Sequence, residues 1–147
     1  MDRNEAISAL GTIDGAQAAL ARAADCPPWR HAVFGALMGT IMLAAGVGPP
    51  LSFALLAISF AAMAMIVVSD RRRMGMFING YRKGATRPLT FVMLGVMLVI
   101  AFGEVHAHHA GLSMATRIGL AVIAAMIATA MSVMWQRIFR RELGLDA

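Results

Sequence analysis

The sequence contains a long stretch without any charged side chain, Ala32–Ser69, which covers 38 residues. About 20 helical residues cross a hydrocarbon core of about 30 Å, because each residue adds about 1.5 Å of rise. The stretch is therefore nearly long enough for two crossings. Its middle, Gly46–Pro50, reads Gly-Val-Gly-Pro-Pro. Prolines cannot donate a backbone hydrogen bond, and they drive the preceding residue out of helical geometry. We expect a helical hairpin with spans at about 31–47 and 51–69.

Two further uncharged runs follow later in the chain. Pro88–Gly103 has 16 residues, which make only about 24 Å of helix, so we expect a longer span at about 87–106. Ile118–Gln136 has 19 residues and predicts a span at about 117–137. The sequence thus predicts an all-α, integral membrane protein whose residues 31–138 form a four-helix transmembrane bundle.

The composition indicates that lipid surrounds part of the folded chain. Hydrophobic residues make up 59% of the 147 residues, charged residues make up 14%, and the mean hydropathy is +0.70. Soluble domains contain about 45–50% apolar and about 25% charged residues. A single domain of 15.6 kDa cannot bury that excess, because small domains keep much of their surface in water. A disordered chain, a disulfide-stapled secreted module and an ordinary cytosolic enzyme are excluded.

The basic residues predict how the chain is threaded through the membrane. In a four-span chain, one side of the membrane carries the N-terminal segment, the segment 70–87, the end of the last span and the C-terminal tail 139–147. This side carries 12 of the 13 Lys and Arg residues, and only Arg117 falls on the other side. The positive-inside rule then places both termini in the cytoplasm. Because the basic residues flank apolar runs, we expect no nucleic-acid partner. The Arg-rich, Lys-poor composition suggests a GC-rich genome, and we expect a bacterial inner (plasma) membrane.

Residues 1–30 are expected to form a cytosolic amphipathic helix followed by a Pro-Pro linker. Apolar side chains recur at helical spacing within 4–24, and Pro27 and Pro28 then break the helix. The segment has no apolar core long enough for a signal peptide. This helix packs on the membrane surface or against the segment 70–87; the alternative is docking to a partner or a second copy.

The segment 70–87 alternates basic residues with apolar ones. This pattern suits a segment in the headgroup layer, where each basic residue gains about 1 kcal/mol near anionic lipid. The alternative is that the charges serve only to fix topology. The candidate lipid-headgroup residues are Arg71, Arg72, Arg73, Arg82, Lys83 and Arg87.

One cluster at the outer end of the third span carries metal-ligand chemistry: Glu104, His106, His108 and His109. On a continuing helix Glu104 and His108 lie four residues apart on one face. Imidazole and carboxylate groups at such spacing can bind Zn²⁺, Cu²⁺ or Ni²⁺. The alternatives are a histidine-rich polar helix end and a structural pair between Glu104 and Arg117. Nothing else in the sequence completes a coordination sphere, and we expect no cofactor.

Methionine is the other outlier, with 13 residues. Met38 and Met42, like Met93 and Met97, are spaced four residues apart within predicted spans. Thioethers bind Cu(I), but methionine also fills gaps in packed helices. Without a Cys-x-x-Cys pair or a cytosolic Met/His tail, the sequence favours packing over copper handling.

Small residues mark the predicted helix-packing faces, because transmembrane helices associate through close backbone approach. Gly35 and Gly39 form the strongest such motif, and Ala121 and Ala125 offer a similar face in the last span. These faces pack within the bundle or against another subunit.

The spans contain no Asp, Lys or Arg in their apolar runs, which disfavours an ion-coupled carrier. No catalytic set of Ser, His, Asp or Cys falls on one side of the membrane, so we expect no enzyme. We expect a small polytopic inner-membrane protein that is an accessory or interaction subunit of a larger complex. Its partners are the bilayer, including anionic lipids, and a membrane protein or a second copy. The alternative is an oligomeric small transport or channel protein with an outer His/Glu metal or proton site.

Overall fold

Four long helices make up most of the chain in the computed structural model, which describes residues 11–13, 15, 26–74 and 84–142. They are α2 (Pro28–Gly46), α3 (Leu51–Met74), α4 (Thr86–His109) and α5 (Met114–Glu142). No strand occurs in these described ranges. The prediction of an all-helical chain is confirmed for this part of the sequence.

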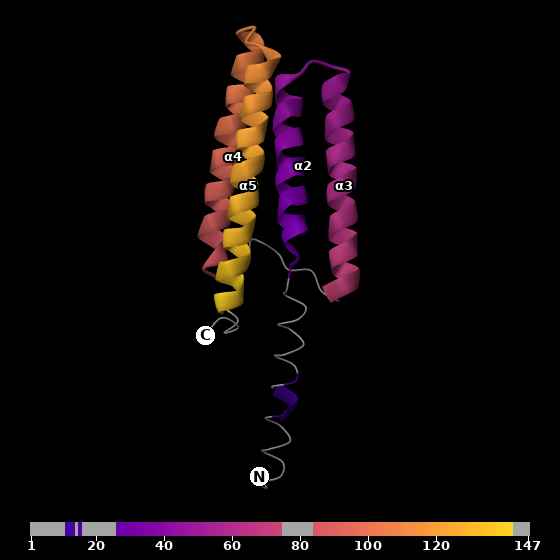
Figure 1. The fold of residues 1–147 in the computed structure, drawn as a ribbon, viewed down its shortest axis with the longest axis vertical. Coiled ribbons are helices and arrows are strands. Elements are labelled where there is room, and N and C mark those ends of the chain that lie inside the picture. The colour runs from indigo at the N-terminus through magenta and orange to yellow at the C-terminus, as the bar shows by residue number, and fades with distance from the viewer. Residues whose placement is uncertain (1–10, 14, 16–25, 75–83, 143–147) are drawn as a thin grey trace.

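The four helices run alternately up and down with nearly parallel axes (Figure 1). The turn after α2 and the loop after α4 lie at the same end, which we call the turn end (residues 46–50 and 104–117). We call the opposite end, with Arg30, Asp70, Arg87 and Gln136, the basic end.

Three of the described helices are long and apolar enough to cross a membrane, which points to a membrane protein. They contain the segments Leu51–Arg72, Thr86–His109 and Met114–Arg141. The remaining helix, α2, has 19 residues but begins with Pro-Trp-Arg-His, so its apolar stretch is shorter. The predicted fourth span therefore stays a prediction.

The helices differ in how much of their surface touches protein. Helix α2 packs against all three others and most extensively against α5, whereas α3 packs extensively against α2 alone. Only 6% of the α3 span is buried inside the bundle, compared with 17% of the α5 span. Helices α2, α4 and α5 thus form a three-helix core, and α3 is a peripheral helix.

The buried apolar core lies where α2, α4 and α5 meet. It consists of Met42, Met97, Ala124 and Ala128, with partly buried apolar side chains packed around it. The two alanines are fully buried, and their small side chains allow α5 to approach the other helices closely.

All four helices extend beyond the predicted spans at one end or both. Helix α4 continues past 106 to His109 and ends where Gly111 adopts a positive φ of 67°. The Leu112 amide donates to the Ala107 carbonyl at 2.9 Å, which is the closing bond of a glycine-terminated helix. Helix α3 continues into the segment 70–87 as far as Met74, because basic side chains are stabilised near a helix C-terminus.

The predicted N-terminal helix is described only in part. Residues 11–13 and 15 are helical, and the rest of 4–24 lies outside the described residues. Residues 75–83 and 143–147, which belong to the predicted headgroup segment and the C-terminal tail, also lie outside them.

Candidate functional site

The closest helix contact joins α2 and α5 through the small residues that the sequence singled out. A Cβ atom on Gly35 would lie 2.5 Å from the Ala125 carbonyl oxygen and against the Thr129 hydroxyl. A Cβ atom on Gly39 would lie 2.7 Å from the Ala121 carbonyl oxygen. The structure therefore brings Gly35, Gly39, Ala121 and Ala125 together inside one chain, and glycine is required at both α2 positions.

A buried histidine joins the same two helices near the basic end. The His31 side chain donates from Nε2 to Oε1 of Gln136 at 2.5 Å. In the neutral ring, Nδ1 then accepts from the Ser132 hydroxyl at 2.8 Å. Both partners lie on one face of α5, four residues apart. His31 as a whole residue is only 8% exposed, so these bonds satisfy a polar group that would otherwise be costly to bury.

An ion pair at the basic end connects α2 to the peripheral helix. The Arg30 guanidinium pairs with the Asp70 carboxylate near the end of α3. Both side chains are partly exposed, so the pair has modest strength. It is nevertheless a polar tie between α3 and the core.

At the turn end, the Glu104 side chain is fully buried against the last residue of α2. A Cβ atom on Gly46 would collide with the Glu104 carboxylate and approach the Arg117 side chain. Neither carboxylate oxygen has a hydrogen-bond partner among the described residues. The Glu104 and Arg117 side chains thus both approach Gly46, but no hydrogen bond joins them.

Arg117 closes the turn end by binding groups from several segments. Its Nη1 donates to the Gly46 carbonyl at 2.7 Å and to Nδ1 of His108 at 3.2 Å. Its Nη2 donates to the Leu112 carbonyl at 3.2 Å. A basic side chain on the last carbonyls of a helix is a favourable cap, so Arg117 fixes the end of α2 to the loop after α4.

The structure does not bring the predicted metal ligands together. Glu104 is buried, whereas His106, His108 and His109 are exposed. The rings of His108 and His109 meet edge to face at 5.7 Å. Among the residues that the structure describes, no group of three His, Cys, Asp or Glu side chains is arranged to hold a metal ion.

The two methionine pairs, by contrast, meet between α2 and α4. They line one cavity of about 280 Å³ between these two helices. Met42 and Met97 are buried at 8% and 6% exposure, and Met38 and Met93 pack against them. The sequence suggested packing for these residues, and the structure adds that the four thioethers share one space. The full lining is Met38, Met42, Thr90, Met93, Leu94, Met97, Leu98 and Ala101.

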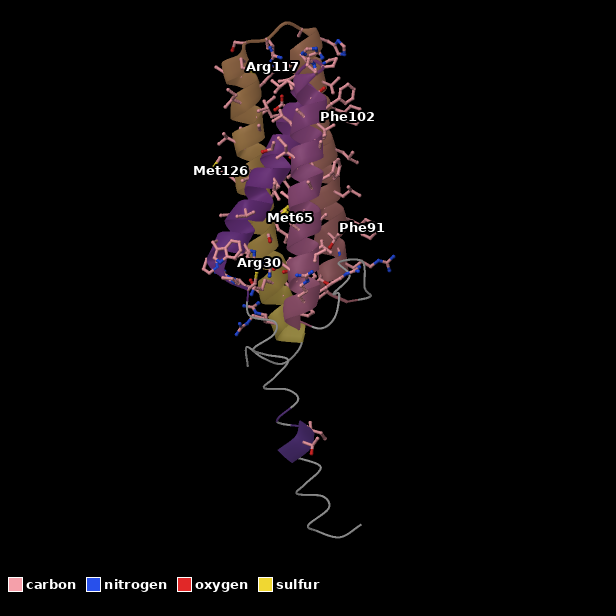
Figure 2. The ribbon with its side chains drawn as sticks, turned by 90° about the vertical axis from the view of Figure 1, so that its right-hand side faces the viewer. Arg30, Met65, Phe91, Phe102, Arg117 and Met126 are labelled. Carbon is pink, nitrogen blue, oxygen red and sulfur yellow. The ribbon has the colours of Figure 1, made fainter. Side chains whose placement is uncertain are left out.

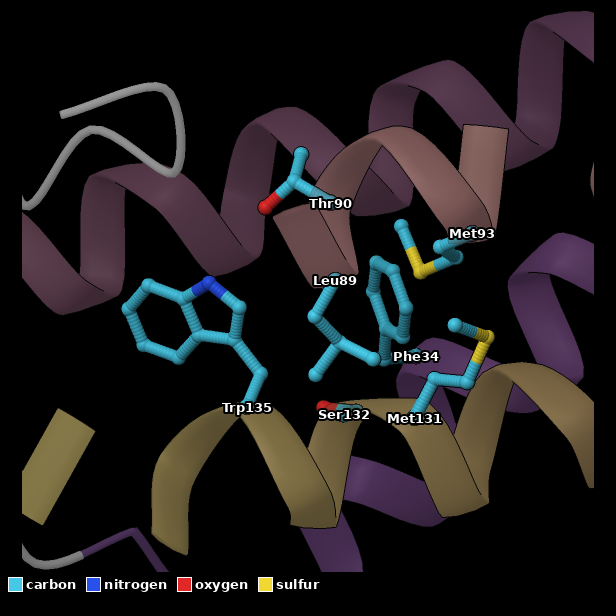
Figure 3. A pocket seen from close by; sticks show the side chains of 7 residues that line it. All are labelled: Phe34, Leu89, Thr90, Met93, Met131, Ser132 and Trp135. Carbon is cyan, nitrogen blue, oxygen red and sulfur yellow. The ribbon is translucent and has the colours of Figure 1, made fainter. Parts of the chain in front are cut away.

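A second cavity of about 190 Å³ adjoins the first toward the basic end. In Figure 3, Met93 from α4 and Met131 from α5 point into this cavity, with the Phe34 ring beside them. The Trp135 indole lies at its edge and stacks on Phe139 at a centroid distance of 5.2 Å. Thr90 and Met93 line both cavities.

Few of the candidate lipid-headgroup residues can be placed. Arg71 and Arg72 are exposed near the end of α3, and Arg87 is exposed at the start of α4. The Arg87 guanidinium lies over the Phe91 ring at 5.7 Å. Arg82 and Lys83 lie outside the described residues, as does the side chain of Arg73.

Comparison with known proteins provides no relative for this arrangement. No protein-family model, curated protein or solved structure matches the chain.

The polar set around His31 was not predicted. Ser132 and Gln136 lie four residues apart in an otherwise apolar run, so they share a helix face. An antiparallel bundle brings the end of its last helix beside the start of its first. The spacing of Ser132 and Gln136, combined with the predicted topology, could therefore have indicated that these two side chains meet the start of the first helix.

Proposed function

We propose that this chain is a small polytopic protein of the bacterial inner membrane that acts as an accessory or interaction subunit of a larger complex. In this proposal α2 is the fourth span. It lies alongside three apolar helices (Figure 1), and its 19 residues make about 28 Å of helix. Its polar residues His31 and Arg30 have partners on α5 and α3.

The proposed orientation places the basic end and both termini in the cytoplasm. Arg30, Arg71, Arg87 and Arg140 belong to the basic ends of their helices, whereas Arg117 belongs to the turn end. This distribution supports the proposal, because basic residues are retained on the cytoplasmic side.

The observation that carries the interaction role is the isolation of α3. This helix is the most apolar of the three candidate spans, with a mean hydropathy of 2.5, and it has one extensive helix neighbour. Phe53, Phe60 and Met65 are 62–73% exposed on it. Figure 2 shows Met65 on α3 near the middle of the view, and Phe91 and Phe102 of α4 at its right-hand edge. We assign this surface to a transmembrane helix of a different membrane protein.

Site-specific photo-crosslinking in cells tests the assignment. A photo-reactive amino acid replaces Phe60 on α3 or, as the control, Met126 on α5, because these side chains are 62% and 59% exposed. We expect a crosslinked product with a second, different protein at position 60 and none at position 126. A product of two copies of this chain, or lipid adducts alone at both positions, would contradict the proposal.

Cysteine labelling tests the topology separately. In a Cys26→Ser background, we expect Gly48→Cys and Ser113→Cys to react with an impermeant reagent from the periplasm. Gly84→Cys is expected to react only after the cytoplasmic side is opened. Labelling of position 48 from the cytoplasm would show that α2 does not span the membrane.

One observation favours the second candidate function, an oligomeric transport or channel protein. Glu104 is a fully buried acid within an apolar helix, and its oxygens lack hydrogen-bond partners among the described residues. Ionisable groups inside membrane segments often mark ion or proton pathways. A change in ion flux in vesicles upon Glu104→Gln would support this candidate, and unchanged background flux in both proteins would oppose it.

A further inference from the structure

We propose that Met38, Met42, Met93 and Met97 form a binding site for a soft monovalent cation such as Cu(I) or Ag(I). The proposal goes beyond the interaction role and does not depend on it. It begins from sequence spacing, since each pair lies four residues apart and therefore on one helix face. The structure places the two faces opposite each other across one cavity.

The ligand chemistry of this cavity is uniform. Its lining contains four thioethers, three aliphatic side chains and one threonine. The threonine hydroxyl is engaged, because Thr90 donates to the Thr86 carbonyl at 3.2 Å. Thioether sulfur is a soft ligand that prefers Cu(I) over hard cations. It is also neutral at every pH, so binding requires no proton release.

Burial favours a single positive charge over a double one. Met42 and Met97 are nearly inaccessible to solvent, and the cavity lining contains no charged side chain. The cost of moving an ion out of water rises steeply with its charge. Neutral ligands cannot offset that cost for a divalent ion, so we expect exclusion of Zn²⁺ and Cu²⁺.

The cavity also has a polar neighbour along α4. Glu104 lies seven residues after Met97, hence about 10 Å further along the helix on nearly the same face. The Arg117 side chain also approaches Gly46, and its positive charge opposes the negative charge of the Glu104 carboxylate. The thioethers, and not this acid, therefore supply the binding energy. This distinguishes the site from the His/Glu cluster at the turn end.

A binding experiment with Ag⁺ tests the site in the full-length protein in detergent, with Cys26→Ser as the background. We expect one tight equivalent by calorimetry, with sulfur neighbours in X-ray absorption, and no binding of Zn²⁺. The double variant Met42→Leu/Met97→Leu should bind at least about tenfold more weakly, as expected when a metal site loses part of its ligand shell. The control variant Met65→Leu/Met126→Leu changes two exposed methionines and should bind like the background.

A loss of Ag⁺ affinity in these variants would not result from misfolding, because methionine-to-leucine replacement nearly conserves side-chain volume. The melting temperature of each variant is measured beside its affinity. Equal Ag⁺ affinity in both double variants, or nitrogen and oxygen neighbours without sulfur, would overturn the proposal. Equal loss in both variants would show that methionines bind Ag⁺ nonspecifically and would also overturn it.

Discussion

Helices α2 and α3 are neighbours in sequence and in space, yet they meet different surroundings. Helix α2 contacts all three other helices, contains two obligatory glycines and has its polar residues paired with α3 and α5. Helix α3 contains the most apolar of the three candidate spans, with a mean hydropathy of 2.5, and only 6% of that span is buried. Among the three candidate spans, the most apolar one is thus the one with the least protein contact.

This difference has a physical cause. In lipid, apolar side chains gain nothing by moving from tails to protein, so tight packing depends on small residues and hydrogen bonds. A central helix can therefore be poorer in apolar residues than a peripheral one. The hydropathy of a helix therefore does not measure how much of it packs against the other helices of the chain.

The largest expected effect is at the glycine contact. Gly35→Leu should destabilise the bundle by about 3 kcal/mol, because overpacking forces backbones apart. The matched change on α3, Ala61→Leu at an exposed position, should stay within about 0.5 kcal/mol. Thermal unfolding in detergent, followed by circular dichroism, measures both. Similar losses for the two variants would remove the distinction between central and peripheral helices.

The next effect concerns the turn end. Arg117→Ala removes donors to the Gly46 and Leu112 carbonyls and should cost about 2 kcal/mol, since hydrogen bonds from charged groups are the strong ones. Arg117→Lys should recover part of this, because one ammonium cannot reach all the same acceptors. Equal stability of the alanine variant and the wild type would show that α2 needs no cap from α5.

A smaller effect is expected at the buried histidine. A double-mutant cycle of His31→Leu and Ser132→Ala isolates their hydrogen bond, and we expect a coupling of about 1 kcal/mol, as found between membrane helices. Thr40→Ala serves as the control, because the Thr40 hydroxyl donates within α2 to Ala36. Additive single effects of His31 and Ser132 would mean that the contact contributes nothing.

The smallest effect is expected where α2 meets α3 at the basic end. Asp70→Asn should cost about 0.5 kcal/mol, because the ion pair is partly exposed. The charge-swapped variant Arg30→Asp/Asp70→Arg should restore part of the loss, and added salt should shrink the difference. Loss of the whole bundle in Asp70→Asn would show that α3 belongs to the core.

Much of the architecture followed from local patterns. Charge-free runs predict helices near the observed α3, α4 and α5, and the Gly-Pro segment marks the turn after α2. The end of α4 was harder to predict from the sequence, because a polar run of Glu and His resembles a loop. The structure shows that Gly111 terminates the helix instead. The methionine pairs and the small residues could be recognised in the sequence, but the residues that they contact in space could not.

The sequence by itself determined that the chain is helical, apolar and asymmetrically charged, since these properties depend on residue type and order along the chain. Only the tertiary structure decided that Gly35 and Gly39 face α5, that four methionines share a cavity and that Glu104 is buried while the three histidines after it are exposed. The reason is that helix periodicity fixes which residues share a face. Which face meets which neighbour depends on rotations of whole helices, and these are set by packing among all four.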